Sequence, residues 1–421
     1  MRRPWSGMNR NSGRFGLPRP VWLLGWVSFF TDTASEMIYP LLPLFLTRVL
    51  GAGAMSLGVI EGVAEAANSV LKIVSGRLSD KSGAPKPLVL LGYVLSSAVR
   101  PLMGFATAWP QVLGLRFTDR LGKGIRGAPR DAMLATFAES HQRGRVFGFH
   151  RAMDHAGAVL GPLLATAFLF FYPDSYRTLF TLTLLPGIVV ILILLRVPNP
   201  PTPGTPGTSG TFRPGTIGTS GTFRPGIRGI LATWRTPGLA RALFVIFLFT
   251  LGNASDTFLL LRLNELGVSA LWIPLLWSAL HVVKVIASLA GGDLSDRFGR
   301  RTLIGLGWIV YALVYAGFGA FVSPPIVIAV FLGYGLYFGL TEGVEKAWVA
   351  DMAPASIRGT AFGLYNAALG IGSLVASLLF GFVWTRVSPA AAFLTGSGLA
   401  VAATLLLYLL FSHEADSRHE R

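Results

Sequence analysis

The stretch TLIGLGWIVYALVYAGFGAFVSPPIVIAVFLGYGLYFGLT (residues 302–341) holds no charged side chain along its whole length. A helix that spans a bilayer needs about 20 apolar residues, and Ser323-Pro324-Pro325 interrupts this stretch near its middle. The stretch therefore predicts two membrane-spanning helices joined by a turn. Residues 178–195 and 387–412 are also free of charge and predict further spans of the same kind.

The composition of the whole chain agrees with this pattern. The chain has 421 residues, of which 52% are hydrophobic and 13% are charged, and its mean hydropathy is +0.58. A soluble protein carries about 25% charged residues. Hydropathy and turn signals predict an all-α integral membrane protein with about twelve transmembrane helices, including a seventh near 238–262 and a tenth near 325–350. The first, near 20–46, is expected to be retained rather than cleaved as a signal peptide.

The placement of the positive charge predicts how the chain crosses the membrane. The net charge is +16, which by itself could indicate a nucleic-acid partner. The excess instead gathers in the N-terminus and in alternate loops between the predicted spans, at Arg2, Arg3, Arg10, Arg14, Arg19, Arg77, Lys81, Lys86, Arg143, Arg145, Arg297, Arg300 and Arg301. Positive charge concentrates on the cytoplasmic side of membrane proteins. We therefore expect no nucleic-acid partner, a cytoplasmic (inner) membrane location and two cytoplasmic termini.

Sequence similarity between two parts of the chain predicts its domains. GRLSDKSG (76–83) matches GDLSDRFG (292–299), and RGRVFGFHRA (143–152) matches RGTAFGLYNA (358–367). Between them lies a Pro/Gly/Thr-rich segment in which GTSGTFRPG occurs twice, and this composition predicts a linker. The expected parts are a basic cytoplasmic N-terminus (1–19), a six-helix bundle (20–196), a cytoplasmic linker (197–237), a second six-helix bundle (238–412) and a cytoplasmic tail (413–421).

The two copies of the loop motif resemble a known family signature. GRLSDKSGAPK (76–86) and GGDLSDRFGRR (291–301) are similar to the loop signature of the major facilitator superfamily, and they follow the predicted second and eighth spans. The resemblance implies two pseudo-symmetric six-helix halves and a gate at the cytoplasmic helix ends. It implies gate roles, rather than substrate contacts, for Gly76, Asp80, Gly292, Asp296 and Arg297. The alternative is that these are ordinary turn and topology residues.

A second resemblance lies in the predicted fifth span. Gly148, Gly157, Gly161 and Pro162 are similar to the helix motif of antiporters in the same superfamily, although Ala165-Thr166 replaces its final glycine pair. The resemblance implies export of a solute. The alternative is that small residues in this span only permit close helix packing.

The predicted fourth span (110–138) is unusually charged for a membrane helix. At about 100° per residue, its charges fall within an arc of roughly 140°, and they are Arg116, Asp119, Arg120, Lys123, Arg126, Arg130 and Asp131. One face of this helix can therefore point into the protein while the other meets lipid. We assign Arg116 and Arg120 to the transport path, and Arg126, Arg130 and Asp131 to the cytoplasmic gate. Buried salt bridges that only fix helix packing are the alternative.

Acidic residues inside other predicted spans are candidates for carrying a proton or contacting a solute. They are Asp32 and Glu36 in the first span, Glu61 and Glu65 in the second, Asp154 in the fifth and Glu345 in the tenth. A charge in the membrane is costly and is usually functional.

These observations predict a secondary active transporter that moves a small solute by alternating access, coupled to protons and acting in efflux. Proton-coupled uptake or exchange of an organic anion is one alternative, and a non-transporting membrane sensor is another. We expect no enzymatic activity, cofactor or metal site, because the sequence has no metal-ligand spacing, no nucleophile motif and no phosphate-binding loop. The expected partners are the solute, protons and the lipid bilayer, and a monomer is expected.

Overall fold

The computed structural model describes residues 16–42, 45–51, 54–200, 236, 238–268 and 272–411. Within these ranges the side chains of residues 40, 47–48, 54–59, 61–66, 69–70, 257 and 273–274 are not described. Helices account for nearly all of the described chain and no strand element is present in it, so the prediction of an all-α fold is confirmed. Most of the predicted N-terminus, most of the predicted linker and all of the predicted tail lie outside the described residues.

Helices before the linker form the first half of the molecule. They are α1 (Arg19–Glu36), η2 (Tyr39–Leu41), η3 (Phe45–Val49), α3 (Ala54–Ser82), α4 (Pro85–Leu102), η4 (Met103–Phe105), α5 (Trp109–Phe137), η5 (Ser140–Gln142), α6 (Arg143–Phe171), α7 (Tyr176–Leu182) and α8 (Leu184–Leu195). Those after the linker form the second half. They are α10 (Leu239–Gly252), α11 (Thr257–Glu265), α12 (Ile273–Phe298), α13 (Arg300–Ala320), α14 (Pro324–Met352), η6 (Ala355–Ile357), α15 (Arg358–Arg386) and α16 (Pro389–Phe411).

Two of the predicted spans are broken rather than continuous. The first, expected over 20–46, leaves the α-helical form after Glu36 and passes through a short 3₁₀ helix that contains Pro40, because proline has no N–H for an α-helical hydrogen bond. The seventh, expected over 238–262, opens between Gly252 and Thr257. There the Tyr311 hydroxyl donates a hydrogen bond of 2.7 Å to the Gly252 carbonyl, which replaces a lost helical hydrogen bond.

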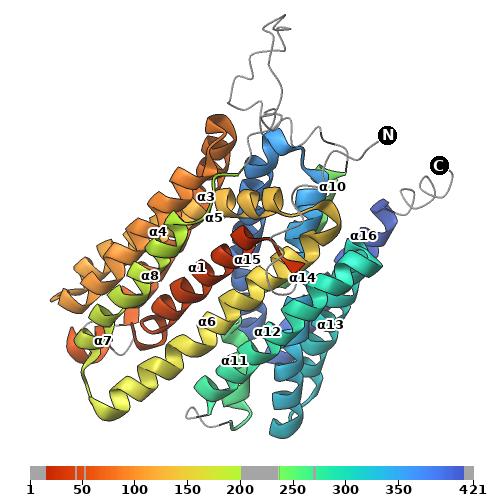
Figure 1. Ribbon diagram of the computed structural model, residues 1–421. Coiled ribbons are helices and arrows are strands. Elements are labelled where there is room, and N and C mark those ends of the chain that lie inside the picture. The colour runs from red at the N-terminus through yellow and green to blue at the C-terminus, as the bar shows by residue number, and fades with distance from the viewer. Residues whose placement is uncertain are drawn as a thin grey trace, which may run out of the picture.

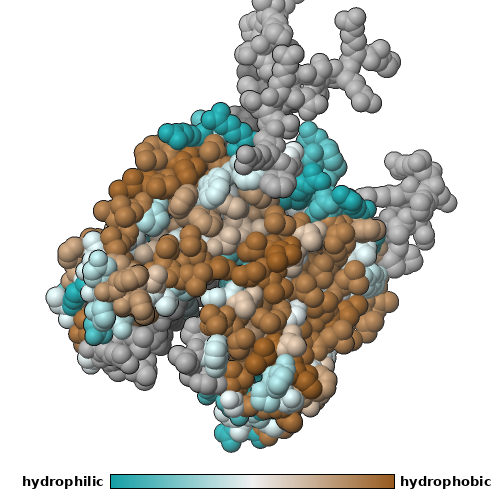
Figure 2. All heavy atoms as spheres, turned by 60° about the horizontal axis from the view of Figure 1, so that its bottom comes forward, coloured by the Kyte–Doolittle hydropathy of each residue, from teal (hydrophilic) through white to brown (hydrophobic). Residues whose placement is uncertain are grey.

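The outer surface of the bundle is suited to lipid. In the described part of the chain, eight helices are long and apolar enough to cross a membrane. Large apolar side chains such as Phe170, Leu313, Leu378 and Leu409 are more than 60% exposed. Figure 2 shows that apolar residues dominate the visible face, with hydrophilic residues gathered mainly toward its upper edge. Exposed apolar area on this scale marks a membrane protein, because it would cause association in water.

The two halves lie side by side, and two helix pairs make the most extensive contacts between them. α6 packs along α12, and α3 packs along α15. Figure 1 shows α1, α4 and α8 on one side and α12, α13 and α16 on the other, with the two groups spreading apart toward the bottom of the view. The surface is hollowed between the groups at that end (Figure 2). We call this the open end, and we call the opposite end, where Asp80 and Asp296 lie, the gate end.

Candidate functional site

Asp80 joins the two halves at the gate end. It lies near the end of α3, in the first half, and its carboxylate accepts hydrogen bonds from the backbone N–H of Gly359 (2.7 Å) and of Thr360 (2.5 Å). The Thr360 hydroxyl donates a third hydrogen bond. Gly359 and Thr360 form the first turn of α15, where N–H groups have no helical partner and the helix dipole favours a negative charge. Asp80 therefore caps a helix of the other half.

Asp296 forms the reciprocal contact from the second half. Its carboxylate accepts hydrogen bonds from the backbone N–H of Gly144 (2.9 Å) and Arg145 (2.8 Å), in the first turn of α6, and it pairs with Arg300. Arg145 also pairs with Asp293 of α12 at 2.5 Å. Each half thus supplies an aspartate that caps a helix of the other, and these contacts hold the two halves together at the gate end.

The predicted gate residue Arg297 makes no ion pair with the first half among the described residues. Its guanidinium is largely exposed and pairs with Asp293, one turn earlier in α12, at 2.8 Å.

Glycines allow the two halves to approach closely at this end. A Cβ on Gly76 would overlap the Gly359 carbonyl, and a Cβ on Gly292 would overlap the backbone of Gly144. Gly148 likewise faces the backbone of α12 and α14. Small residues at these crossings bring helix backbones into contact, as is usual between membrane helices.

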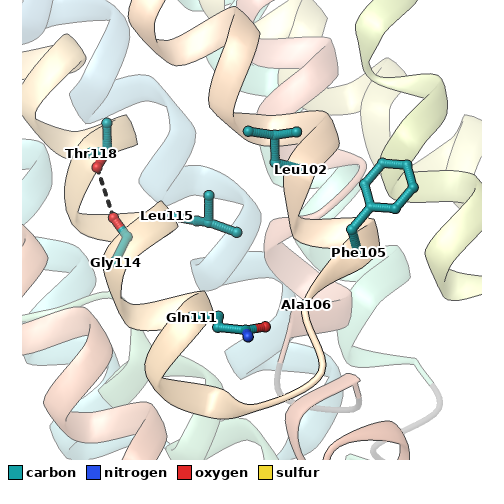
Figure 3. A pocket seen from close by; sticks show the side chains of 7 residues that line it. All are labelled: Leu102, Phe105, Ala106, Gln111, Gly114, Leu115 and Thr118. Carbon is teal, nitrogen blue, oxygen red and sulfur yellow. Dashed lines mark hydrogen bonds between the residues drawn. The ribbon is translucent and has the colours of Figure 1, made fainter.

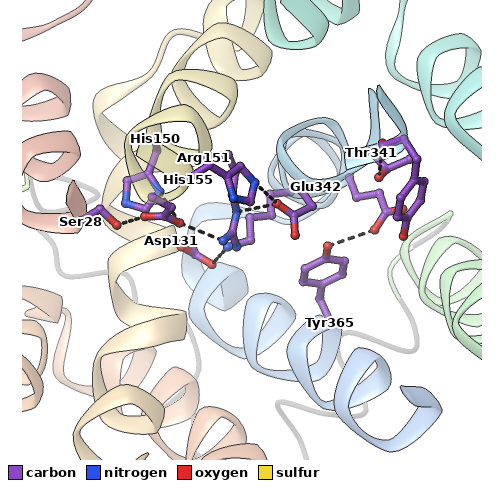
Figure 4. Close-up of polar contacts among 12 residues, drawn as sticks. Ser28, Asp131, His150, Arg151, His155, Thr341, Glu342 and Tyr365 are labelled. Carbon is purple, nitrogen blue, oxygen red and sulfur yellow. Dashed lines mark hydrogen bonds and ion pairs between the residues drawn. The ribbon is translucent and has the colours of Figure 1, made fainter. Parts of the chain in front are cut away.

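A buried charged layer lies between the gate end and the middle of the bundle (Figure 4). Asp131 of α5 pairs with Lys346 of α14 at 2.5 Å and with Arg130 at 3.0 Å. Glu342 of α14 approaches His155 Nε2 at 3.1 Å and Arg151 Nε at 3.9 Å, both on α6. The pairs that involve α14 join the first half to the second, and Asp131 and Lys346 are almost fully buried.

Asp154 extends this layer into the first half. Its carboxylate pairs with Arg151 at 2.9 Å and with His150 at 3.7 Å, and it accepts a hydrogen bond from the Ser28 hydroxyl of α1 (Figure 4). The predicted path residue is therefore connected, through Arg151, to Glu342 of the second half.

Arg126, assigned to the gate from the sequence, is located within the first half. It donates a hydrogen bond of 2.6 Å to Ser96, and its guanidinium lies 4.4 Å from the centre of the Tyr93 ring. Its partners come from α4, and none of these contacts reaches the second half.

The basic path residues near the open end meet acidic and aromatic partners. Arg116 pairs with Asp119 at 3.6 Å and lies 5.1 Å from the centre of the Tyr39 ring. Asp119 pairs more closely with Arg100, at 3.0 Å. Arg120 is partly buried on the same helix. The structure therefore balances part of the basic face of α5 with a buried carboxylate.

Asp32 and Glu36 lie on the last two turns of α1, away from the gate end, and both are partly exposed. No hydrogen bond or ion pair within 4 Å joins either carboxylate to another side chain among the described residues. Gly157 and Gly161 of α6 lie against the backbone of α1 at Phe29, Thr33 and Glu36, so these glycines position the two carboxylates. Pro162 follows inside α6. The side chains of Glu61 and Glu65 lie outside the described residues.

Glu345 is buried in the second half with neutral partners. Its carboxylate accepts hydrogen bonds from Trp308 Nε1 (3.2 Å) and from the Tyr365 hydroxyl (3.0 Å). No cation pairs with it within 4 Å in the described part of the chain. Glu342 and Lys346, its neighbours on α14, instead form ion pairs with charged residues of the first half.

Glu342 and Lys346 were missed in the sequence interpretation. Both interrupt the otherwise apolar span expected over 325–350, and that interruption was the available signal.

A separate groove on the outer face lies between the end of α4 and the start of α5 (Figure 3). It is lined mainly by apolar residues such as Leu102, Phe105 and Leu115, and it contains none of the charged groups described above.

The fold and site define a membrane transporter: an apolar helical bundle in two halves, closed at one end by reciprocal contacts and charged in its interior. Comparisons with known proteins place it more narrowly. The family model of the Major Facilitator Superfamily matches residues 24–344 and 263–421. The chain belongs to this superfamily.

Individual relatives and structures agree with this placement. The chain is 35% identical over 402 residues to an uncharacterized MFS-type transporter of Methanocaldococcus jannaschii, covering 94% of this chain and 95% of the relative. It is 31% identical over 131 residues to the multidrug resistance protein MdtH of Enterobacter sp., covering 31% and 32%. The solved structure of the E. coli fucose:proton symporter FucP has a TM-score of 0.74 at 13% identity, covering 93% of this chain and 98% of FucP.

Proposed function

We propose that this protein is a proton-coupled efflux transporter of the cytoplasmic membrane, in which protons enter from the open end as a small solute leaves. The two bundles, 20–196 and 238–412, rock about the contacts between α6 and α12 and between α3 and α15. The gate end faces the cytoplasm, since the basic loops after α3 and α12 lie there. Both termini are then cytoplasmic, and the monomer is the working unit.

The observation that carries the proposal is the position of the Asp32 and Glu36 carboxylates and their lack of a cation partner among the described residues. Both carboxylates lie toward the open end without an ion-pair partner among the described residues, whereas Asp119, Asp131 and Asp154 are each paired with a cation. A carboxylate that is not held by a cation can gain and lose a proton without stranding a buried positive charge. An antiporter needs such groups where protons from outside can reach them.

Two further observations support the efflux direction. Gly157 and Gly161 belong to the antiporter-like motif, and they set the position of α1 beside Asp154. The chain also matches about a third of MdtH, which is named a multidrug resistance protein.

The experiment uses the full chain in proteoliposomes with an imposed pH gradient and a panel of radiolabelled solutes. We expect solute movement driven by the proton gradient in the wild type. Asp32→Asn and Glu36→Gln should each reduce that movement at least ten-fold while the protein still inserts and folds. Glu139→Gln, an exposed carboxylate between α5 and α6, should leave it unchanged. Wild-type-like movement in both path variants would refute the assignment.

Uptake or exchange of an organic anion is the second candidate, and it rests on the basic residues of α5. In the same assay it would appear as solute accumulation on the side toward which protons flow, rather than depletion. A non-transporting sensor would bind a solute without moving it in any gradient.

A further inference from the structure

Lys284 is a buried cation that makes no hydrogen bond with the described residues. It lies on α12 and is 3% exposed. Its ammonium group has three N–H donors. Within the described residues, the closest carboxylate oxygen is Asp256 Oδ2, at 3.8 Å, which is too long for a hydrogen bond. A buried charge in this state costs free energy unless another group completes its hydrogen bonds.

Lys346, a second buried lysine among the described residues, provides an internal comparison. Lys346 has the same degree of burial, 3%, and contacts Asp131 at 2.5 Å. Lys346, which joins two helices, is thus held by a short ion pair, and the longer contact of Lys284 needs another explanation.

Asp256 is already engaged elsewhere. It stands at the break in the seventh span, directly before α11, and its Oδ1 accepts a hydrogen bond of 2.8 Å from the Tyr334 hydroxyl. Its side chain is 27% exposed. The backbone of a membrane protein departs from helical form at membrane depth where it is buried or lines a cavity, and broken helices in transporters border the solute site. Asp256 therefore keeps Lys284 near this site without satisfying its donors.

Aromatic rings surround the ammonium group. Lys284 Nζ is 3.5 Å from the centre of the Phe338 ring and 5.2 Å from that of Trp277. Tyr334 packs edge-to-face on Phe338, with ring centres 4.8 Å apart. The ring faces attract the cation but accept no strong hydrogen bond, and they offer flat apolar walls to a ring on a solute.

We propose that Lys284 is the anchor for the anionic group of the transported solute, and that the solute is an aromatic or otherwise apolar carboxylate. Its carboxylate accepts hydrogen bonds from the Lys284 ammonium, and its apolar part packs against Trp277 and Phe338. This inference rests on the proposed function, because it names the class of solute that the transporter moves. Attraction between the two charges is strong there because the surroundings contain little water.

The test measures binding to the full chain in phosphatidylcholine nanodiscs, using three fluorescent probes with one ring system. These are 2-naphthoate, 2-naphthamide and 2-naphthylmethylammonium. We expect 2-naphthoate to bind at least ten-fold more tightly than the other two. Lys284→Met should remove this preference and leave 2-naphthamide binding unchanged, while Lys284→Arg retains the preference.

Lys81→Met, at an exposed lysine near the end of α3, is the matched control and should bind the probes as the wild type does. Equal binding of all three probes, absence of binding by the wild type, or a preference for 2-naphthoate that survives in Lys284→Met would each overturn the inference. Failure of proton-coupled efflux would be seen separately, as a lack of gradient-driven movement of any solute in proteoliposomes. The order of probe affinities would then still decide the role of Lys284.

Discussion

Asp131 and Lys346 are 215 residues apart in the chain, yet their carboxylate and ammonium groups lie 2.5 Å apart in the buried layer between the halves. Both side chains are at least 96% buried. The pair therefore joins α5 of the first half to α14 of the second, and separation of the halves there would leave both charges without each other.

Neutralisation of Asp131 alone should be more harmful than removal of the charges of both Asp131 and Lys346. Asp131→Asn leaves Lys346 buried without its partner, which costs about 3–5 kcal/mol of unfolding free energy, whereas Lys346→Met costs less because Asp131 keeps its pair with Arg130. The double variant Asp131→Asn/Lys346→Met should recover at least half of the loss caused by Asp131→Asn. Chemical unfolding in detergent measures all three variants. Additive losses in the double variant would contradict the pairing.

Asp80→Asn should open the gate end. The substitution removes the negative charge and one acceptor from the first turn of α15, and we expect the closed state to lose about 1–2 kcal/mol, roughly five- to thirty-fold in the closed-to-open ratio. The chain has no cysteine. Spin labels on Ser82→Cys and Ser356→Cys, two exposed positions at the gate end, can therefore report the change as reduced dipolar broadening in EPR spectra.

Asp174→Asn provides the control for this prediction. Asp174 lies in the loop between α6 and α7 with a φ of 59°, which asparagine tolerates. The same labels should give the wild-type spectrum in this variant. An Asp80→Asn spectrum identical to it would mean that the cap does not hold the gate.

Gly148→Ala and Gly333→Ala should change stability in opposite directions. The new methyl group at Gly148 would overlap the Ser288 carbonyl of α12, so we expect a loss of about 1–3 kcal/mol. Gly333 lies inside α14 with open space around it, so alanine there should stabilise the helix by about 0.5–1 kcal/mol. Thermal unfolding of the two variants in the same detergent tests the difference. An unchanged or raised unfolding temperature in Gly148→Ala would show that the α6–α12 contact is looser than described.

Glu345→Gln should preserve the fold and impair transport. No cation is stranded by this change, and the amide oxygen still accepts a hydrogen bond from Trp308 or Tyr365, so the unfolding free energy should fall by no more than about 1 kcal/mol. Because we place Glu345 in the proton path, gradient-driven solute movement should decrease at least ten-fold. Glu265→Gln, at the exposed end of α11, should behave as the wild type. Normal movement in Glu345→Gln would remove this residue from the path.

The sequence was sufficient for the features that depend on local composition. Runs without charge, such as 302–341, predicted membrane helices, because burial of apolar side chains in lipid needs no knowledge of the partner helix. The repeated loop motif predicted a two-half transporter, and the helical arc of α5 predicted that its charges share one side. The sequence could not predict the break after Gly252. The Tyr311 and Tyr337 hydroxyls that form hydrogen bonds with Gly252 and Asn253 come from helices distant in the chain.

The partner of each charge, by contrast, was decided by the tertiary structure. A helical arc gives the direction of a side chain around its own axis, but it does not identify the helix that stands opposite. Arg126 and Asp131 share the charged face of α5, yet Arg126 lies on Tyr93 within its own half while Asp131 contacts Lys346 of the other. Packing of the two halves separates these roles, because only a side chain at the interface can reach across it.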